Sequence, residues 1–329
     1  MNYLIFGGEG FIGSHLIRHL TEIKGVSPQH IYSLDIRKQD RLVIDYKYVY
    51  CDVRLPITLE IPDLDSSIVY NLAAVHITPG HPDKEYFETN ILGAEHVTTF
   101  AEEHGINEIN FTSSIAPYGA SEQEKSEATI PMPNSPYGIS KLVAEKIHMI
   151  WQTKDIEKRK LLILRPGVVF GKGEGGNFTR LYNSMKKGFF FYPGRRDTIK
   201  ASVYVKDVVR ILIEGGSKVI SGVQLYNLSV YPAPTIEEVC ETIAHVTAVS
   251  KPKVTVPAWA LTLVSKMVYG LGRLIGKSFS GIHPDRVKKV MISTNINGGK
   301  LDQSELKLNY TLEQGVKDWL VDCGGESLY

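Results

Sequence analysis

The sequence predicts an α/β protein in which a doubly wound parallel sheet is followed by a smaller, mixed C-terminal region. Two observations lead to this prediction. Strand-like runs alternate with helical patterns through the first half of the chain, and a glycine-rich turn directly follows the first run. Strands that alternate with helices are typical of βαβ units, whose strands lie parallel. With 329 residues, the chain is long enough for one large domain or two modest ones.

The expected strands of the first half are short and rich in β-branched and aromatic residues. They cover residues 3–6, 31–35, 46–52, 66–74, 106–115 and 160–166. The helical patterns between them cover residues 11–23, 84–104 and 137–154. This alternation places the parallel sheet in a first domain, residues 1–166, and leaves residues 167–329 as a second region.

The pattern becomes irregular after residue 166. Residues 171–177 are typical of a flexible loop, and residues 202–205 and 224–229 are isolated strand-like runs between helices. Both runs are compatible with a return to the main sheet. We expect this smaller region to pack over the end of the sheet where a substrate would bind.

The bulk composition restricts the class of partner. Hydrophobic residues make up 43% and charged residues 22% of the chain, as in an ordinary globular protein. The formal net charge of +1 gives no electrostatic reason to expect nucleic acid or an anionic membrane. Cys51, Cys240 and Cys323 are odd in number and lack metal-ligand spacing, so we expect reduced thiols, no metal site and a cytoplasmic location. The N-terminus shows no basic segment of a secretory signal.

One long apolar segment, residues 256–276, raises the question of a membrane. Lys266 and Arg273 interrupt it, and two glycines weaken it as a helix. A membrane-spanning helix needs about 20 residues with few or no charges. We therefore predict one or two buried or amphipathic helices and do not expect membrane contact; the alternative is a helix that lies at the membrane surface.

The glycine-rich turn "FGGEGFIGSHL" (6–16) has the spacing G-x-x-G-x-x-G. Its glycines are Gly7, Gly10 and Gly13, between the first strand and the first helix. Glycine allows a tight turn and lets the backbone approach a pyrophosphate, which then lies on the N–H groups of the helix N-terminus, here at Phe11 and Ile12. A glycine turn that binds nothing is the alternative. The strand before it and the helix after it favour a dinucleotide site of the Rossmann type.

Asp35 ends the second strand, 22 residues after Gly13. A carboxylate at this place accepts hydrogen bonds from the adenosine ribose and repels a 2′-phosphate, so it favours NAD over NADP. Arg37 and Lys38 follow and would weaken this preference.

Tyr137 and Lys141 are four residues apart at the start of an expected helix, in "SPYGISKLVAE" (135–145). Positions i and i+4 share one face of a helix, about 5–6 Å apart at Cβ. A cation beside a phenol lowers the phenol's pKa, which is about 10 when unperturbed. The pair is therefore a candidate general base with its activator, or else an exposed tyrosine and a solvated lysine.

With these motifs in place, the chain resembles the extended short-chain dehydrogenase/reductase superfamily, and within it the NAD-dependent epimerase/dehydratase family. Further motifs match in order along most of the chain. They are "CDVR" (51–54), "NLAA" (71–74), "TNILGAEHV" (89–97), "FTSSIAPYG" (111–119), "RPGVVFG" (165–171) and "ASVYVKDVV" (201–209).

The resemblance implies a set of functional residues. Tyr137 would be the general base, Ser114 would hydrogen-bond the same substrate oxygen, and Lys141 would also hold the nicotinamide ribose. The other residues implied to contact NAD are Asp52, Val53, Leu72, Ala73, Ala74 and Asn90. The resemblance also implies a homodimer built from the helices at 84–104 and 137–154, for which Ala101, Val143, Ile147 and Ile150 offer an apolar stripe.

Within the superfamily, the chain is most similar to nucleotide-sugar 4-epimerases of the UDP-glucose 4-epimerase kind. "GGNFTRL" (175–181) resembles their substrate loop and implies a substrate contact at Asn177. Lys200 occupies the slot of a diphosphate-binding arginine, so Arg195 or Arg196 is a further candidate for that contact. Val168 stands where many sugar-nucleotide enzymes carry asparagine.

The resemblance implies inversion at C4 of a nucleotide-diphosphate sugar through a 4-keto intermediate. A dehydratase is not expected, because Ile115-Ala116 replaces the Asp-Glu pair of those enzymes. The alternatives are an oxidoreductase on an apolar alcohol of the 3β-hydroxysteroid dehydrogenase kind, a nucleotide-sugar 4-ketoreductase, and a non-enzymatic NAD(H) sensor or scaffold. The sensor would normally have lost Tyr137 or Lys141.

Overall fold

The computed structural model describes residues 1–39, 44–76, 80–219, 221–263 and 291–328. Residues 264–276 of the apolar segment therefore lie outside the described residues. Among those that the structure describes, no helix is both long and apolar enough to cross a membrane.

Seven parallel strands form the main sheet, in the order β11-β7-β5-β4-β1-β2-β3. Their bounds are β1 (Tyr3–Phe6), β2 (Ile31–Asp35), β3 (Lys47–Tyr50), β4 (Ile68–Asn71), β5 (Glu108–Thr112), β7 (Lys160–Pro166) and β11 (Gly222–Leu228). The order reverses at β1, so the sheet is doubly wound and the predicted fold class is confirmed. The strand-like run expected near 224–229 lies at the edge of this sheet, as β11, whereas that near 202–205 does not join it.

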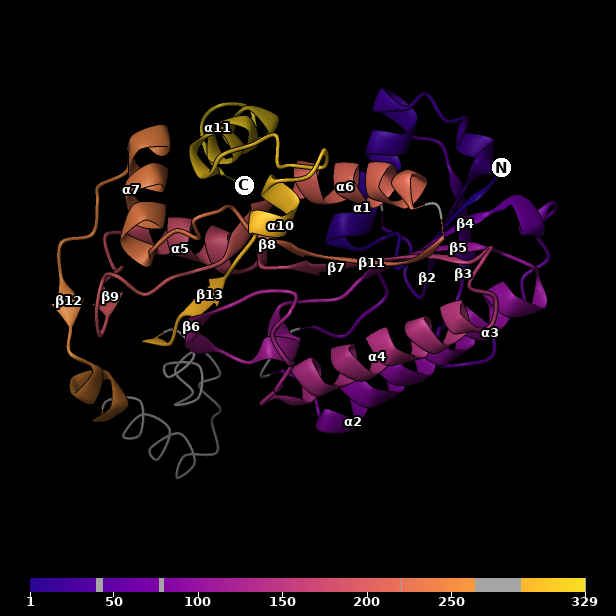
Figure 1. The fold of residues 1–329 in the computed structure, drawn as a ribbon. Coiled ribbons are helices and arrows are strands. Elements are labelled where there is room, and N and C mark those ends of the chain that lie inside the picture. The colour runs from indigo at the N-terminus through magenta and orange to yellow at the C-terminus, as the bar shows by residue number, and fades with distance from the viewer. Residues whose placement is uncertain (40–43, 77–79, 220, 264–290, 329) are drawn as a thin grey trace, which may run out of the picture.

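Helices cover both faces of the sheet (Figure 1). One face carries α1 (Phe11–Arg18), its continuation His19–Ile23, and α6 (Val205–Lys218). The other face carries α4 (Pro136–Thr153) and a nearly continuous helix made of α2 (Asp83–Phe87), Glu88–Leu92 and α3 (Gly93–Glu103). Short 3₁₀ turns at Pro28–His30, Leu64–Ser66 and Ala116–Tyr118 complete this half.

Helix α4 begins where its local sequence directs it to begin. Ser135 is the N-cap, and its hydroxyl accepts a hydrogen bond from the Gly138 N–H at 3.1 Å. Pro136 follows at the first helical position, where its missing N–H costs nothing. This start fixes Tyr137 in the first turn, at the carboxyl-terminal edge of the sheet.

The apolar stripe expected for a dimer is divided between two environments. Ala101 is fully buried in the core, and Ile147 packs against that core. Val143 and Ile150 are exposed, so only two of the four predicted residues lie on the outer face of α4. Exposed Ile139 extends it by one turn.

The C-terminal half has a core of its own around Phe170 and Trp319. Its helices are α5 (Asn177–Lys186), α7 (Ile236–Thr247), α10 (Gly299–Asp302) and α11 (Leu312–Asp322). Within the described part of the chain, three two-stranded parallel sheets pair β10 (Ser202–Tyr204) with β8 (Val168–Phe170), β12 (Thr255–Val256) with β9 (Tyr192–Pro193), and β13 (Thr294–Ile296) with β6 (Ser121–Lys125).

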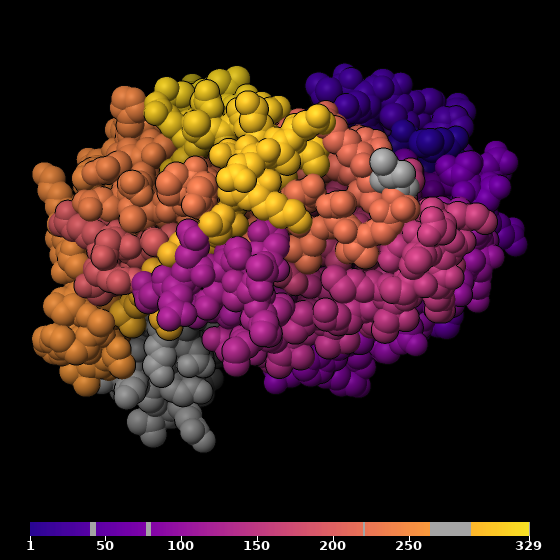
Figure 2. Space-filling model, viewed as in Figure 1, coloured from indigo at the N-terminus to yellow at the C-terminus, as the bar shows by residue number. Residues whose placement is uncertain are grey.

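The β13–β6 pair joins the two halves. In the space-filling view, the yellow C-terminal residues lie directly against the purple residues around β6 (Figure 2). The sequence did not indicate β6, β9, β12 or β13, because each is short and polar or isolated.

Candidate functional site

The glycine turn forms a cradle at the point where the strand order reverses. Gly7 has φ of +79°, and a Cβ atom there would lie 2.7 Å from the backbone N of Ala73. A Cβ at Gly13 would lie 2.5 Å from the carbonyl oxygen of Gly7. Both approaches require glycine. Without these side chains, the backbone of the turn packs directly against Ala73 and against the start of α1. A pyrophosphate would lie on the free N–H groups of the first turn of α1.

The segment after β4 lies beside this cradle. Leu72 N–H donates to the Phe6 carbonyl at 2.9 Å, which continues the pairing of β4 with β1. Ala73 then passes directly over Gly7. The structure thus brings together two segments, 7–13 and 72–74, that were predicted separately to contact the cofactor.

Asp35 lies at the end of β2, next to the same turn. Its carboxylate accepts hydrogen bonds from the N–H groups of Glu9 and Arg37, each at 3.2 Å. Burial raises the pKa of Asp35, and these two backbone hydrogen bonds oppose that rise. The carboxylate therefore lies beside the glycine turn, within reach of the place where the sequence analysis expects an adenosine ribose to bind.

Glu9 is a residue that the sequence analysis missed. It is buried, and its carboxylate accepts from the Ser33 hydroxyl at 2.5 Å, the Tyr46 hydroxyl at 3.0 Å and the Gln39 N–H at 2.8 Å. The sequence feature that could have identified Glu9 is its position as an acidic residue within the glycine motif. Its position adds a second carboxylate beside Asp35, and the negative charge of both would oppose a 2′-phosphate.

Three other predicted cofactor residues have partners within the protein. Asp52 forms a two-pronged ion pair with Arg54, whose hydrogen bonds lower the pKa of the Asp52 carboxyl. Val53 is buried against Gly93. Asn90 bonds both backbone groups of Val75, and its side-chain N–H donates to the Ser140 hydroxyl at 2.8 Å.

The Asn90 contacts join two elements next to the candidate catalytic residues. They fix the loop after β4 and the residue that precedes Lys141. We therefore interpret Asn90 as a residue that positions α4 against this loop.

The structure brings Tyr137, Ser114 and Lys141 together at the carboxyl ends of β4 and β5. A hydrogen bond joins the Tyr137 and Ser114 side chains. Lys141, one turn along α4, is buried, and its Nζ donates to the Thr112 carbonyl at 2.6 Å and lies 4.3 Å from the centre of the Phe111 ring. The exposed-pair alternative from the sequence does not describe this site, because Lys141 is buried and Tyr137 is half-buried and hydrogen-bonded to Ser114.

The electrostatics of the pair differ from the expectation. Burial raises the pKa of Tyr137, and the hydrogen bond from Ser114 only partly offsets this. Burial also lowers the pKa of Lys141 to about 7, and the charge of Glu145 partly offsets that change. Lys141 does not lower the pKa of the phenol as expected, because its ammonium is directed to the Thr112 carbonyl and is itself poorly solvated.

Glu145 belongs to a buried network beneath the site that the sequence analysis did not identify. Its carboxylate accepts two hydrogen bonds from Arg165, at 2.8 and 2.5 Å, and one from the Ser113 hydroxyl at 2.5 Å. Arg165 also donates to the Tyr118 hydroxyl at 2.7 Å. Because Ser113 precedes Ser114 and Glu145 follows Lys141 by one turn, the network fixes both ends of the candidate catalytic group.

The residues expected to bind the diphosphate lie in the C-terminal half and are also engaged. Asn177 is exposed at the start of α5 and accepts from Arg180 at 2.9 Å. Arg195 pairs with Glu122 and donates to the Ser293 hydroxyl at 3.0 Å. Lys200 donates to the Ile292 carbonyl at 2.8 Å, and burial lowers its pKa to about 8.

Arg195 and Lys200 therefore converge on one place. Both contact the backbone or side chains of residues 292–293, and Glu122 on β6 influences both cations. The sequence analysis missed Glu122, since nothing in its local pattern distinguishes it from a surface residue. Among the described residues, Asn177 contacts Arg180 and is not part of this cluster.

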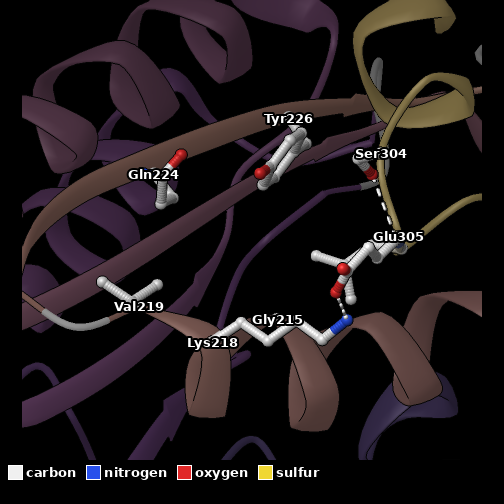
Figure 3. Close-up of a pocket in the computed structure, with 8 residues that line it drawn as sticks. Gly215, Lys218, Val219, Gln224, Tyr226, Ser304 and Glu305 are labelled. Atoms are coloured by element: carbon white, nitrogen blue, oxygen red, sulfur yellow. Dashed lines mark hydrogen bonds and ion pairs between the residues drawn. The ribbon is translucent and has the colours of Figure 1, made fainter.

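A hollow on another part of the molecule is not the candidate site. It is lined by α6, β11 and residues 304–306, and an exposed ion pair between Lys218 and Glu305, 2.7 Å long, lies across it (Figure 3). It lies near the amino end of β11, whereas the cofactor cradle lies at the carboxyl ends of the strands. In parallel α/β sheets ligands bind at the carboxyl ends.

The parallel sheet, the glycine cradle at its reversal point, and Tyr137 and Lys141 on one helix define a dinucleotide-dependent enzyme of the short-chain dehydrogenase/reductase type. The model of the NAD dependent epimerase/dehydratase family matches residues 3–227. The chain belongs to this family. NAD is its cofactor, and the cradle at Gly7 and the carboxylate of Asp35 fit that group.

Individual relatives are consistent with this assignment. The chain is 27% identical over 316 residues to N-acetyl-alpha-D-glucosaminyl-diphospho-ditrans,octacis-undecaprenol 4-epimerase of Escherichia coli O157:H7, covering 96% of this chain and 93% of the relative. It is 26% identical over 292 residues to UDP-glucose 4-epimerase of Vibrio cholerae, covering 84% and 82%. Among solved structures, MoeE5 in complex with UDP-glucose and NAD matches with a TM-score of 0.66 and 25% identity, covering 78% of this chain and 86% of that one.

Proposed function

We propose that the protein inverts C4 of a sugar that is linked to a diphosphate, by NAD-dependent oxidation to a 4-keto intermediate and reduction from the opposite face. The observation that carries this proposal is the hydrogen bond between Tyr137 and Ser114, with buried Lys141 one turn after Tyr137 on α4. Two of the relatives above are named as 4-epimerases of diphosphate-linked sugars, which supports the choice of reaction.

When bound, NAD supplies the acceptor and the donor of the hydride. The protein's residues manage the proton. Tyr137 takes the proton of the C4 hydroxyl through its phenolic oxygen, and Ser114 hydrogen-bonds the same substrate oxygen. Lys141 is buried one turn along α4 with a pKa of about 7, and it would return towards its charged form when a phenolate develops at Tyr137. On the return half of the reaction, Tyr137 gives its proton back to the C4 oxygen.

A nucleotide is the carrier that the sequence resemblance favours. Arg195 and Lys200 would hold its diphosphate, and they lie together beside residues 292–293. For Arg195 to bind a phosphate, its ion pair with Glu122 must open, and the exposed position of this pair makes that inexpensive. Asn177 would approach from the start of α5.

A polyprenyl chain is a second candidate for the carrier. The observation that favours it is the Escherichia coli relative, whose substrate is named as a sugar on an undecaprenyl diphosphate and which matches nearly the full length of both chains. The reaction and the catalytic residues would be unchanged, because only the group beyond the diphosphate differs.

We also propose that two copies pair through the outer face of α4 and the neighbouring helix. Ile139, Val143 and Ile150 are exposed on α4, and Phe87 and Leu92 are exposed beside them. Light scattering of the purified protein tests this: an Ile150→Asp variant that remains as large as the wild type would contradict it. A cytoplasmic location remains a prediction, supported by three free cysteines.

The decisive test of the function is incubation with a panel of UDP-, GDP-, CDP- and dTDP-sugars, together with a GlcNAc-diphosphate-polyprenol, without added NAD. Product sugars are then identified after release. Inversion at C4 without added cofactor is expected for at least one of them. Net oxidation that requires added NAD would instead indicate an oxidoreductase, and no turnover of any sugar would overturn the proposal.

A further inference from the structure

Two short stretches of the C-terminal half combine lysines with exposed apolar side chains. They are "KKGFFF" (186–191) and "KPKVTVPAWALTL" (251–263), and neither contains an acidic residue. The exposed fractions are 79% for Phe189, 40% for Phe191, 60% for Val254, 72% for Trp259 and 53% for Leu263. Single exposed apolar residues are ordinary, but a group of five within two short stretches is not.

Strand pairing brings these stretches together. The Tyr192 N–H donates to the Val254 carbonyl at 2.9 Å and the Gly194 N–H to the Val256 carbonyl at 2.8 Å, which forms the β9–β12 pair. Arg196 then donates to the Lys253 carbonyl at 2.6 Å. The two stretches are therefore adjacent at the β9–β12 pair, at the left end of the molecule in Figure 1, far from β2 and β3.

Four lysines accompany the apolar side chains. Lys186 and Lys187 precede Phe189, and Lys251 and Lys253 precede Val254. All four are exposed, and Lys251 is paired with Glu241. We refer to the five apolar residues and these lysines as the apolar–basic surface. Tryptophan and phenylalanine with flanking lysines are the residue types that lie at the boundary between water and a bilayer with anionic lipids.

The surface adjoins the place where a diphosphate would be held. Helix α5 begins at Asn177, in the expected substrate loop, and ends at Lys186. Its ten residues span about 15 Å. On the other side, Arg195 follows β9 after a single glycine. A carrier that leaves the diphosphate in this direction meets apolar side chains.

We propose that the apolar–basic surface docks on an anionic lipid bilayer, where the enzyme takes a sugar diphosphate carried by a polyprenyl chain. The choice of carrier rests on the proposed epimerisation of a diphosphate-linked sugar; the docking does not. The bilayer supplies what both parts of the surface need, an apolar phase for Trp259 and Phe189 and negative head groups for the lysines. Docking at the surface requires no spanning helix.

Co-sedimentation of the full chain with vesicles tests the docking. Vesicles of phosphatidylcholine with phosphatidylglycerol should bind the protein at least about fivefold better than phosphatidylcholine alone, and added salt should weaken this preference. A Phe189→Ser/Trp259→Ser double variant should bind these vesicles at least about tenfold more weakly than the wild type. A Lys186→Gln/Lys187→Gln variant should lose the preference for anionic vesicles.

The matched control is Ile23→Ser/Val321→Ser. These two residues are 68% and 72% exposed and lie outside the surface, so the control should bind vesicles like the wild type. Absence of vesicle binding by the wild type, or equal binding by the control and the Phe189/Trp259 variant, would overturn the docking.

The carrier is tested separately from the reaction. The wild type should epimerise GlcNAc-diphosphate-polyprenol in anionic vesicles, and the Phe189/Trp259 variant should lose at least about tenfold of this rate. The variant should retain any wild-type activity on a soluble UDP-sugar. Epimerisation of UDP-sugars with none of the polyprenyl substrate would overturn the carrier and leave the proposed reaction intact. If the wild type turned over neither the polyprenyl substrate nor any UDP-sugar but still bound anionic vesicles, the proposed reaction would be overturned and the docking would stand.

Discussion

The cofactor half and the substrate half of this molecule are constructed differently. In the cofactor half, the functional residues lie just after the strands of one large sheet or on the helices that pack against it, and most of their surroundings are buried. In the substrate half, the candidate diphosphate ligands lie among short two-stranded sheets, and their partners are an exposed acid, a backbone carbonyl and an exposed arginine. The buried pair of Glu145 and Arg165 and the exposed pair of Arg195 and Glu122 represent this contrast. If the proposed roles hold, the catalytic residues are supported by a buried ion pair, whereas the candidate diphosphate ligand Arg195 must exchange an exposed one.

Replacing Tyr137 gives the largest expected effect. Tyr137→Phe removes the proton acceptor but keeps the ring that packs beside Tyr86, so the fold and NAD affinity should change little. Turnover should fall by about 10²–10⁴-fold, the usual contribution of general acid–base catalysis. Ser114→Ala should be milder, because it removes a hydrogen bond and not the base. Steady-state kinetics and NAD titration measure both; epimerisation at the wild-type rate would exclude Tyr137 as the base.

Breaking the buried ion pair should be the most damaging change to stability. Glu145→Ala leaves the Arg165 guanidinium buried without its main partner, which should cost about 3–5 kcal/mol of unfolding free energy. Glu145→Gln should cost less, since the amide still accepts from Ser113. Urea denaturation measures the loss. A cost below about 1 kcal/mol would mean that the cofactor half is not held by this network.

The burial of Lys141 predicts a pH dependence of stability. Its pKa is about 7 in the folded chain and about 10.4 when unfolded. Between these values the unfolded chain binds more protons, so stability should rise with pH by about 1.4 kcal/mol per unit and be flat below pH 7. Lys141→Met should remove this slope. The measurement is the difference in unfolding free energy between the wild type and the Lys141→Met variant from pH 7 to 9.5. The titration of all other groups is common to both proteins and cancels in this difference. A difference that stays constant with pH would contradict the lowered pKa of Lys141.

The two carboxylates at the adenosine ribose should set cofactor choice. Asp35→Asn removes one negative charge, and the ratio of NADP to NAD affinity should rise about tenfold. Glu9→Gln should shift the ratio in the same direction by less, because its carboxylate is already hydrogen-bonded to Ser33 and Tyr46. Fluorescence titration with both cofactors gives the ratio. Asp52→Asn is the control, and an equal shift there would remove any special role for Asp35.

The smallest expected effect concerns the exposed pair. Glu122→Gln should change the unfolding free energy by only about 0–1 kcal/mol, because both side chains are solvated. Freed from Glu122, Arg195 should bind the diphosphate more readily, so KM should fall while kcat is unchanged. A stability loss comparable to that of Glu145→Ala would erase the proposed contrast between the two halves.

The same contrast explains what the sequence could and could not predict. The glycine turn, the alternation of strands and helices, and the Tyr137–Lys141 spacing are short-range patterns, and the structure places these residues at the carboxyl-terminal edge of one parallel sheet. The β6–β13 pairing joins Glu122 to Ser293 across most of the chain, and no local pattern encodes it. Glu9 was missed because its partners, Ser33 and Tyr46, come from two other parts of the chain.

The pKa of Tyr137 was also beyond prediction from spacing. The i and i+4 positions indicated a neighbouring cation, but the direction of the pKa shift of Tyr137 depends on burial and on where the Lys141 ammonium is directed. Only the fold shows that the Lys141 Nζ donates to Thr112.

Strand β11 limits how this protein can be recombined. It pairs with β7 along seven residues, from Gly222 beside Lys160 to Leu228 beside Pro166, although 55 residues of the substrate half precede it in the chain. A gene fragment that stops after residue 166 would therefore leave β7 as an uncovered edge, open to pairing with other chains. The two halves therefore cannot be exchanged between relatives as independent units. A chimera that takes its carrier specificity from a relative must keep residues 222–228 with the cofactor half, and exchange the loops on either side of them.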